Sequence, residues 1–451
     1  MRMRLLFLLI LLTIAAAGCA STGTTIGRAA PDGGNEIRAY RLPNGIHLLV
    51  IETDQSASTS IQVWVPGGSG ADPKDKQGIA HFVEHMLFTG SLHIPAGKAE
   101  EYLESMGGRL TAHTSQDFTC IAATIPGEES INGGWNRAEE ILFDMAAYPA
   151  FNESRMEEQR KVVLMEIAQR AREPETRLTE NLFAAAYEVH PYKNPVTGTA
   201  DNVKSFTRED IFDYYRSAYG PSNMTVVVVG GVDAHEVYAK VESTFGAMLP
   251  SNYLMPAAAS AEIYQSEERS SELQMPVKLA YAELGWHICP ADNPDTYALE
   301  VLSAILGGGR GSRLYMELRE RQGIVYDIKT EMFRLREPGL MAVEAHMEPD
   351  NIAQYSDVVL REVDRLKDRY VPEAELDRAK RTIVASHLTG GETAEGQAYA
   401  LGYWATVYGE NDPGQYIQGI QGVTREAVRR AAQKYLGEGN YTLSTIVPEN
   451  K

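Results

Sequence analysis

The chain has 451 residues, 44% hydrophobic and 23% charged, which is a globular composition and excludes a disordered or collagen-like chain. That length exceeds one ordinary domain of about 100–200 residues, so two or more domains are expected. With 61 acidic and 42 basic residues, the formal net charge is -19. This balance argues against a nucleic-acid partner and favours basic ones. Three cysteines cannot form a disulfide framework, so packed cores must provide the stability.

The N-terminal segment has the pattern of a secretory signal. A short basic stretch precedes the uninterrupted apolar run Leu5–Leu12, and small residues follow. Residues 1–18 are therefore predicted to be removed, because the run is shorter than the roughly 20 residues of a membrane span. The run Ala16–Cys19 resembles a bacterial lipobox, which implies that Cys19 is diacylated and becomes the mature N-terminus. The alternative is an ordinary cleaved signal in which the cysteine is fortuitous.

The lipobox resemblance also implies a location. Ala20, and not an aspartate, follows the cysteine, which in a Gram-negative host favours anchoring in the outer membrane, facing the periplasm. Residues 19–34 are rich in Gly, Ser, Thr and Ala and are predicted to form a flexible tether.

The next segment, residues 35–248, is predicted to be one domain of mixed strands and helices. Apolar alternation predicts strands at 37–42, 46–51, 59–65, 110–113, 119–125 and 224–229. Helical periodicity predicts helices at 77–88, 99–106, 136–148, 154–171, 175–188, 207–218 and 233–245.

A similar order of elements follows a Pro-, Ala- and Ser-rich linker at 249–272, and residues 273–451 are predicted to form a second domain. Its expected strands are 277–284, 325–333, 340–346 and 442–446, and its expected helices are 295–306, 350–368, 372–388, 394–406 and 424–436. High helix content and antiparallel runs of strands predict an α+β fold, in which each of two similar domains packs an antiparallel-rich sheet against helices.

One predicted helical turn carries the strongest chemical signal. His81 and His85 are four residues apart and lie on one helix face, with Glu84 beside them. Two imidazoles so placed can bind one tetrahedral zinc ion, with the carboxylate as general base for a metal-bound water. About 0.03 such patterns are expected by chance in this composition, and this inverted order is a metallopeptidase signature. The alternative is a helix whose two histidines are satisfied by hydrogen bonds.

A catalytic zinc site needs a third protein ligand. The best candidate is Glu166, on a predicted helix that Val162 and Val163 indicate to be buried. Glu157 and Glu158 on the same helix compete for this role, and Glu166 is otherwise a solvated helix residue.

These motifs resemble those of the pitrilysin (insulinase-like, mitochondrial-processing-peptidase-like) metallopeptidases. The helix and its continuation to Ser91 resemble the family's zinc helix, and the segment ending in Glu166 resembles its third-ligand helix. The resemblance implies one Zn²⁺ per chain held by His81, His85 and Glu166, with Glu84 as base. It extends over residues 36–447 and implies two halves that face each other around a peptide-binding chamber.

Two further matches concern the substrate. Residues 107–117 resemble the family's active-site edge strand, which implies that Thr111 and Ala112 contact a peptide that adds to the sheet as a strand. Arg319 and Tyr326 are seven residues apart, as are the arginine and tyrosine with which the family grips substrate. The alternatives are a surface salt bridge for Arg319 and a core aromatic for Tyr326.

The chain also departs from the family pattern. Gln159 stands where the family often has a glutamate that aids catalysis, so we treat it as a residue supporting the site. The first hypothesis is a lipid-tethered zinc endopeptidase for unfolded, preferentially basic peptides. The second is a non-catalytic or partner-dependent peptide-binding subunit of the same fold, and the third is a structural lipoprotein. Because four-domain family members are about twice as long, this chain is expected to form a homodimer or to pair with a related subunit.

Overall fold

The computed structural model describes residues 26–29, 36–53, 57–250, 261–409 and 413–449. The predicted signal at 1–18, Cys19 and most of the predicted tether lie outside these residues, as does the centre of the predicted linker. Within them, no helix has the length and apolar character needed to cross a bilayer.

The first half of the chain forms a seven-stranded sheet in the order β1-β2-β3-β7-β4-β6-β5. Its strands are β1 (Ile26–Ala29), β2 (Glu36–Arg41), β3 (His47–Glu52), β4 (Ser58–Pro66), β5 (Arg109–Thr114), β6 (Phe118–Pro126) and β7 (Thr225–Gly230). The accompanying helices are α1 (Ile79–Leu87), α2 (Lys98–Ser105), α3 (Gly127–Glu129), α4 (Trp135–Ala147), α5 (Glu153–Arg170), α6 (Pro174–Ala186), α7 (Ala200–Ser205), α8 (Arg208–Ala218) and α9 (Ala234–Ser243). All pairings are antiparallel except β3 with β7.

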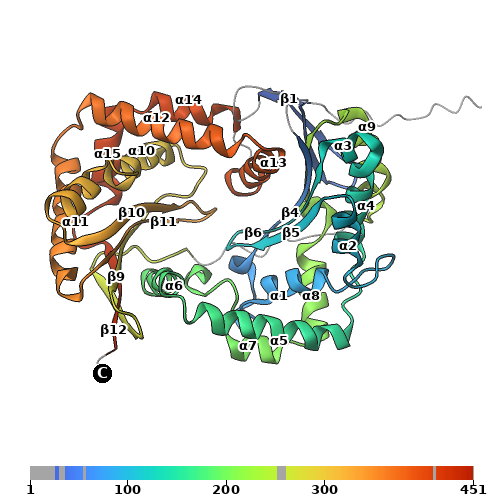
Figure 1. The fold of residues 1–451 in the computed structure, drawn as a ribbon, viewed down its shortest axis with the longest axis horizontal. Coiled ribbons are helices and arrows are strands. Elements are labelled where there is room, and N and C mark those ends of the chain that lie inside the picture. Colours follow the sequence, from blue (N-terminus) through green and yellow to red (C-terminus); the bar gives the residue numbers. More distant parts are fainter. Residues whose placement is uncertain (1–25, 30–35, 54–56, 251–260, 410–412, 450–451) are drawn as a thin grey trace, which may run out of the picture.

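The second half forms a five-stranded sheet in the order β10-β11-β9-β12-β8. Its strands are β8 (Arg269–Met275), β9 (Ala280–His287), β10 (Val325–Phe333), β11 (Leu340–Met347) and β12 (Tyr441–Pro448). Its helices are α10 (Asp295–Gly307), α11 (Ile352–Asp368), α12 (Glu373–Gly390), α13 (Ala394–Tyr403), α14 (Tyr416–Gly422) and α15 (Arg425–Tyr435). The predicted α+β class with two helix-covered sheets is confirmed (Figure 1).

Each half contributes one helix to the sheet of the other. Helix α6 packs on β9 and β12 of the second sheet, where Leu178 joins a buried cluster with Ile446. Helix α13 packs on β4 and β7 of the first sheet. Its Gly402 lies so close that a Cβ would be 2.1 Å from the Trp64 indole, so only glycine permits this approach. The two halves therefore share buried surface and are not independent cores.

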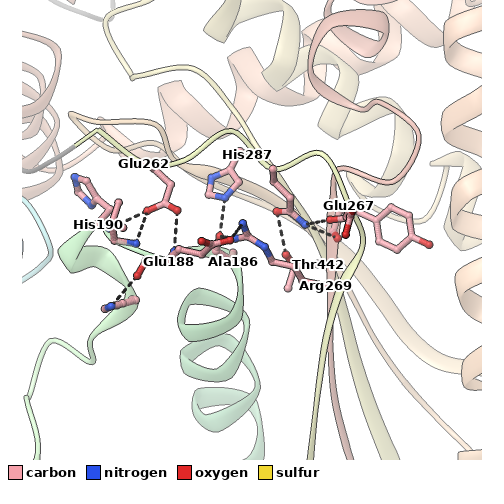
Figure 2. A network of polar contacts seen from close by, with 12 residues as sticks. Ala186, Glu188, His190, Glu262, Glu267, Arg269, His287 and Thr442 are labelled. Carbon is pink, nitrogen blue, oxygen red and sulfur yellow. Dashed lines mark hydrogen bonds and ion pairs between the residues drawn. The ribbon is translucent and has the colours of Figure 1, made fainter.

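The junction after α6 is also held by polar contacts (Figure 2). The Glu262 carboxylate accepts hydrogen bonds from the backbone N–H groups of Glu188, Val189 and His190 at 2.7, 3.1 and 2.8 Å. His287 Nε2 on β9 donates to the Ala186 carbonyl at 3.0 Å. These contacts attach the C-terminal end of α6 to the second half.

The structure contains elements that the sequence did not predict, namely the short helices α3, α7 and α14 and two strand segments. Ile26–Ala29, inside the predicted tether, forms β1 and pairs antiparallel with β2. Arg269–Met275 forms β8, although its first four residues were assigned to the linker. Both segments are polar or rich in small residues and have weak local strand signals. They become strands because a neighbouring strand offers its unpaired backbone groups. The cysteines Cys120 and Cys289 are buried and free.

Candidate metal centre

Helix α1 is fixed at its start by a carboxylate. The Asp72 side chain accepts hydrogen bonds from the backbone N–H groups of Gly78 and Ala80 at 2.6 and 3.1 Å. Gly78 has φ 91° and packs against the Gly198 backbone, a conformation that favours glycine. The apolar residues of α1 are buried in the hydrophobic core of the first half. This packing fixes the helix and therefore the direction in which its two histidines point.

The structure brings together the three predicted ligands. The Nε2 atoms of His81 and His85 each lie 3.5 Å from Glu166 Oε2 on α5. One donor atom from each of the three residues lies within 4.8 Å of the others. Two imidazoles and a carboxylate converging on one point are a donor set that Zn²⁺ accepts, with a fourth position left for water or substrate.

The charges around the three donors also suit a divalent cation. Burial lowers the pKa of His81 to about 4, so its imidazole is neutral and offers a lone pair. Burial alone would lower the pKa of His85 too, but the hydrogen bond to Glu166 and the Glu84 and Glu166 charges outweigh it and raise that pKa. The same bond from His85 lowers the pKa of Glu166. The residues present therefore fit the metal.

Helix α5 supplies two residues to the site. Gln159 Oε1 lies 3.3 Å from His85 Nδ1, so that nitrogen donates and Nε2 is left to face the centre. Glu157 and Glu158 instead pair with Arg160 and Arg155 at 2.9 and 2.7 Å on the exposed side of the helix.

The prediction that Val162 and Val163 both bury α5 was wrong in part. Val163 is buried, but Val162 is 40% exposed, because the helix packs on α1 and α7 with one face only.

Glu84 is held by a residue that the sequence analysis missed. The Thr114 hydroxyl on β5 donates to Glu84 Oε2, and Thr114 is buried. Burial raises the pKa of Glu84, while this hydrogen bond opposes the shift. Thr114 is the last residue of β5 and lies on the same face as Leu110 and Ala112. That alternation of inward and outward residues was the one feature of the sequence that could have indicated an inward-facing Thr114.

The predicted substrate strand lies at the edge of the sheet. Strand β5 pairs with β6 on one side and is the last strand in the sheet order. Thr111 is exposed and Ala112 is half-buried. Backbone groups along the other side of β5 therefore have no strand partner among the described residues.

Arg319 and Tyr326 lie in the second half and their polar partners do too. Arg319, on the π-helical turn Tyr315–Arg321, lies 3.9 Å from the Asp327 carboxylate and above the Tyr315 ring. The Tyr326 hydroxyl on β10 donates to Glu348 at 2.7 Å, and the residue is 55% exposed. Its exposure excludes the core-aromatic alternative, but the structure does not place either residue against the three candidate ligands.

Comparison with known proteins identifies the family to which this fold belongs. Residues 48–200 match the family model described as Insulinase (Peptidase family M16), and residues 205–383 match that described as Peptidase M16 inactive domain. The two models follow each other in one chain, and the second also covers β7 of the first sheet. The chain belongs to the M16, insulinase-like, peptidase family, as the motifs predicted.

Relatives in sequence agree with this assignment, and solved structures share the fold. The chain is 28% identical to a probable mitochondrial-processing peptidase subunit beta of Arabidopsis thaliana, over 92% of this chain and 78% of that protein. It is 28% identical to an uncharacterised zinc protease of Mycobacterium leprae, over 88% of each chain. A protease from Helicobacter pylori has the same fold with a TM-score of 0.86 and 23% identity, covering 92% of this chain and 100% of that one. A chain of complex III2 from Candida albicans has a TM-score of 0.77 and 16% identity, covering 90% and 95%.

Proposed function

We propose that this protein is a zinc-dependent endopeptidase that hydrolyses unfolded peptides. One observation carries the proposal: the His81, His85 and Glu166 donor atoms converge, and Glu84 projects from the same helix turn beside them. Relatives named as zinc proteases support zinc as the metal, one ion per chain at this site.

The residues divide the chemistry between them. Zinc supplies a Lewis acid and lowers the pKa of a bound water when it occupies the site. Glu84, half-buried and held by Thr114, takes the proton of the attacking water and returns it to the leaving amine. Gln159 keeps the His85 ring in one orientation.

The substrate class follows from the edge strand. An extended peptide would add to β5 through backbone hydrogen bonds and contact Thr111 and Ala112, so unfolded peptides are the natural substrates. The net charge of -19 favours basic peptides. Arg319 and Tyr326 would contact the same peptide from the second half, across the proposed chamber.

A second candidate is a subunit that needs a partner. The names of one relative, a processing-peptidase subunit, and of one structural neighbour, a complex III chain, favour it. The partner in this case would be a second copy of this chain or a related subunit.

A peptide-library digest tests both candidates. Purified protein is incubated with unstructured peptides, with and without chelator, and the products are identified by mass spectrometry. Chelator-sensitive cleavage by the protein alone supports the endopeptidase. No cleavage by zinc-loaded wild-type protein, with cleavage restored by a co-purified subunit, supports the partner-dependent candidate.

We also propose that Cys19 is lipidated and anchors the chain in the bacterial envelope, in the outer membrane on the periplasmic side. The signal-like pattern before Cys19 supports this. Mass spectrometry of the native N-terminus should find a diacylated Cys19. A free amino group on Ala20, or an intact residue 1, contradicts the proposal.

A further inference from the structure

A second group of titratable residues lies where α6 of the first half covers the second sheet. Glu175 stands in the first turn of α6, and Glu344 and His346 point from one face of β11. His346 Nε2 is 3.2 Å from Glu344 Oε1 and 3.7 Å from Glu175 Oε1. Donor atoms of these three residues lie within 4.8 Å of one another, as at the candidate zinc centre.

A buried carboxylate beside this group provides an independent observation. Glu283 on β9 lies directly opposite Glu344 in the strand pairing, so both carboxylates project under α6. Glu283 is 0% exposed, and its Oε1 atom has no hydrogen-bond partner among the described residues. Its other oxygen accepts from the Thr179 hydroxyl on α6 at 3.2 Å. A buried carboxylate oxygen without a partner is costly when the group is ionised, and a cation nearby would offset that cost.

The nearby ammonium group of Lys329 does not offset that cost. Lys329 on β10 lies 2.9 Å from Glu344 Oε2, whereas His346 lies against the other oxygen, Oε1. In the described part of the chain, neither Glu175 nor Glu283 has a lysine or arginine within ion-pair distance. Burial and then the Glu344 charge raise the pKa of Glu283 to about 8, and a cation bound beside Glu344 would oppose that shift.

We propose that Glu175, Glu344 and His346 bind a second divalent transition-metal ion, which clamps α6 onto the second sheet. One imidazole with two carboxylates suits zinc or manganese, whereas calcium and magnesium take oxygen ligands alone. The Glu175 side chain is 66% exposed, which leaves the ion a path from solvent.

The position of the clamp gives it a structural role. Helix α6 begins at Pro174, shortly after α5 ends at Arg170, and α5 carries Glu166. An ion bound between α6 and β11 ties the first half, next to its candidate zinc ligand, to the second half. The site is independent of the proposed catalytic zinc, since the two groups share no residue.

Metal counting on the full chain tests the clamp. Chelator-stripped protein is reloaded with Zn²⁺, desalted and analysed by mass spectrometry for zinc per chain. Wild type should hold two equivalents, and the double variant His81→Ala/His85→Ala should hold one. Adding Glu175→Gln or His346→Ala to that double variant should reduce the count to zero, whereas adding His235→Ala, an exposed histidine outside both groups, should leave one.

A thermal readout accompanies the count. Zn²⁺ at about 100 times its dissociation constant should raise the unfolding midpoint of the double variant by about 3 °C, and Glu175→Gln should abolish this shift. The proposal is overturned if the double variant binds no zinc, or if its Glu175→Gln derivative still binds one equivalent. A wild type that binds one ion, retained in the double variant, would instead contradict the proposed catalytic centre.

Discussion

Replacing Glu84 by glutamine separates the general base from the metal ligands. The amide oxygen that Glu84→Gln introduces can still accept from the Thr114 hydroxyl, so the helix and the strand should keep their positions. Loss of the carboxylate removes general-base catalysis, which typically contributes about 10²–10⁴-fold, or about 3–5 kcal/mol of barrier. The variant should therefore fold normally and cleave peptides about 10²–10⁴-fold more slowly.

Zinc binding should survive this change. The Glu84 charge is one of the groups that raise the pKa of His85, so its removal lowers that pKa and reduces competition from protons. Glu166→Gln should behave in the opposite way. It replaces an ionised donor by a neutral amide, and zinc affinity should fall by more than about 100-fold, with activity partly restored at high zinc.

The assay measures zinc per chain and cleavage of an unstructured basic peptide for each purified variant. Glu157→Gln is the matched control, because Glu157 lies on the same helix as Glu166 but faces Arg160, and it should leave both quantities unchanged. Loss of zinc in Glu84→Gln, together with full activity and full zinc in Glu166→Gln, would refute the assignment of roles.

Three further changes probe the site and its surroundings. Thr114→Val removes the hydrogen bond that lowers the pKa of Glu84, so kcat/KM should fall about 10–100-fold and the acidic limb of the pH–rate profile should move to higher pH. Arg319→Ala and Tyr326→Phe should each lower kcat/KM about 10–100-fold at unchanged metal content, measured by steady-state kinetics beside metal analysis. Glu139→Gln should stabilise the protein by about 2–3 kcal/mol at about pH 8 and hardly at all near pH 4.5, measured by denaturant unfolding.

The pH dependence expected for Glu139→Gln follows from the direction in which burial shifts the pKa of Glu139. Burial raises the pKa of Glu139 to about 7, above its value of 4.5 in the unfolded chain. The protonated carboxyl therefore favours folding below pH 4.5, and this contribution is lost as the pH rises through 7. A glutamine cannot ionise and avoids the loss. Equal stability of wild type and variant at about pH 8 would contradict the argument.

Matched controls accompany the two kinetic predictions. Thr114→Ser keeps the hydroxyl and should retain most activity, and an equal loss in the serine and valine variants would show that packing alone matters. Arg321→Ala removes a neighbouring cation that pairs with Glu317, and it should not change kcat/KM. Unchanged kinetics in both Arg319→Ala and Tyr326→Phe would leave that pair with a structural role only.

The sequence by itself determined the local part of the metal centre. His81, Glu84 and His85 lie within one helical turn, and the apolar residues around them make that turn a buried helix wherever the chain packs it. Local periodicity also predicted most strands and helices and the α+β class, because each such element has an apolar face of its own. The family resemblance pointed to Glu166, but helix periodicity alone left Glu157 and Glu158 as alternatives.

Only the tertiary structure decided which distant groups meet. The packing of α5 on α1 brings Glu166 to the two histidines, and this contact is what distinguishes it from Glu157 and Glu158. The pairing of β5 with β6 carries Thr114 to Glu84, and the exchange of α6 between halves brings Glu175 to β11. The physical reason is the same in each case: these contacts join residues far apart in the chain, so they depend on how whole elements pack and leave no periodic trace in the local sequence.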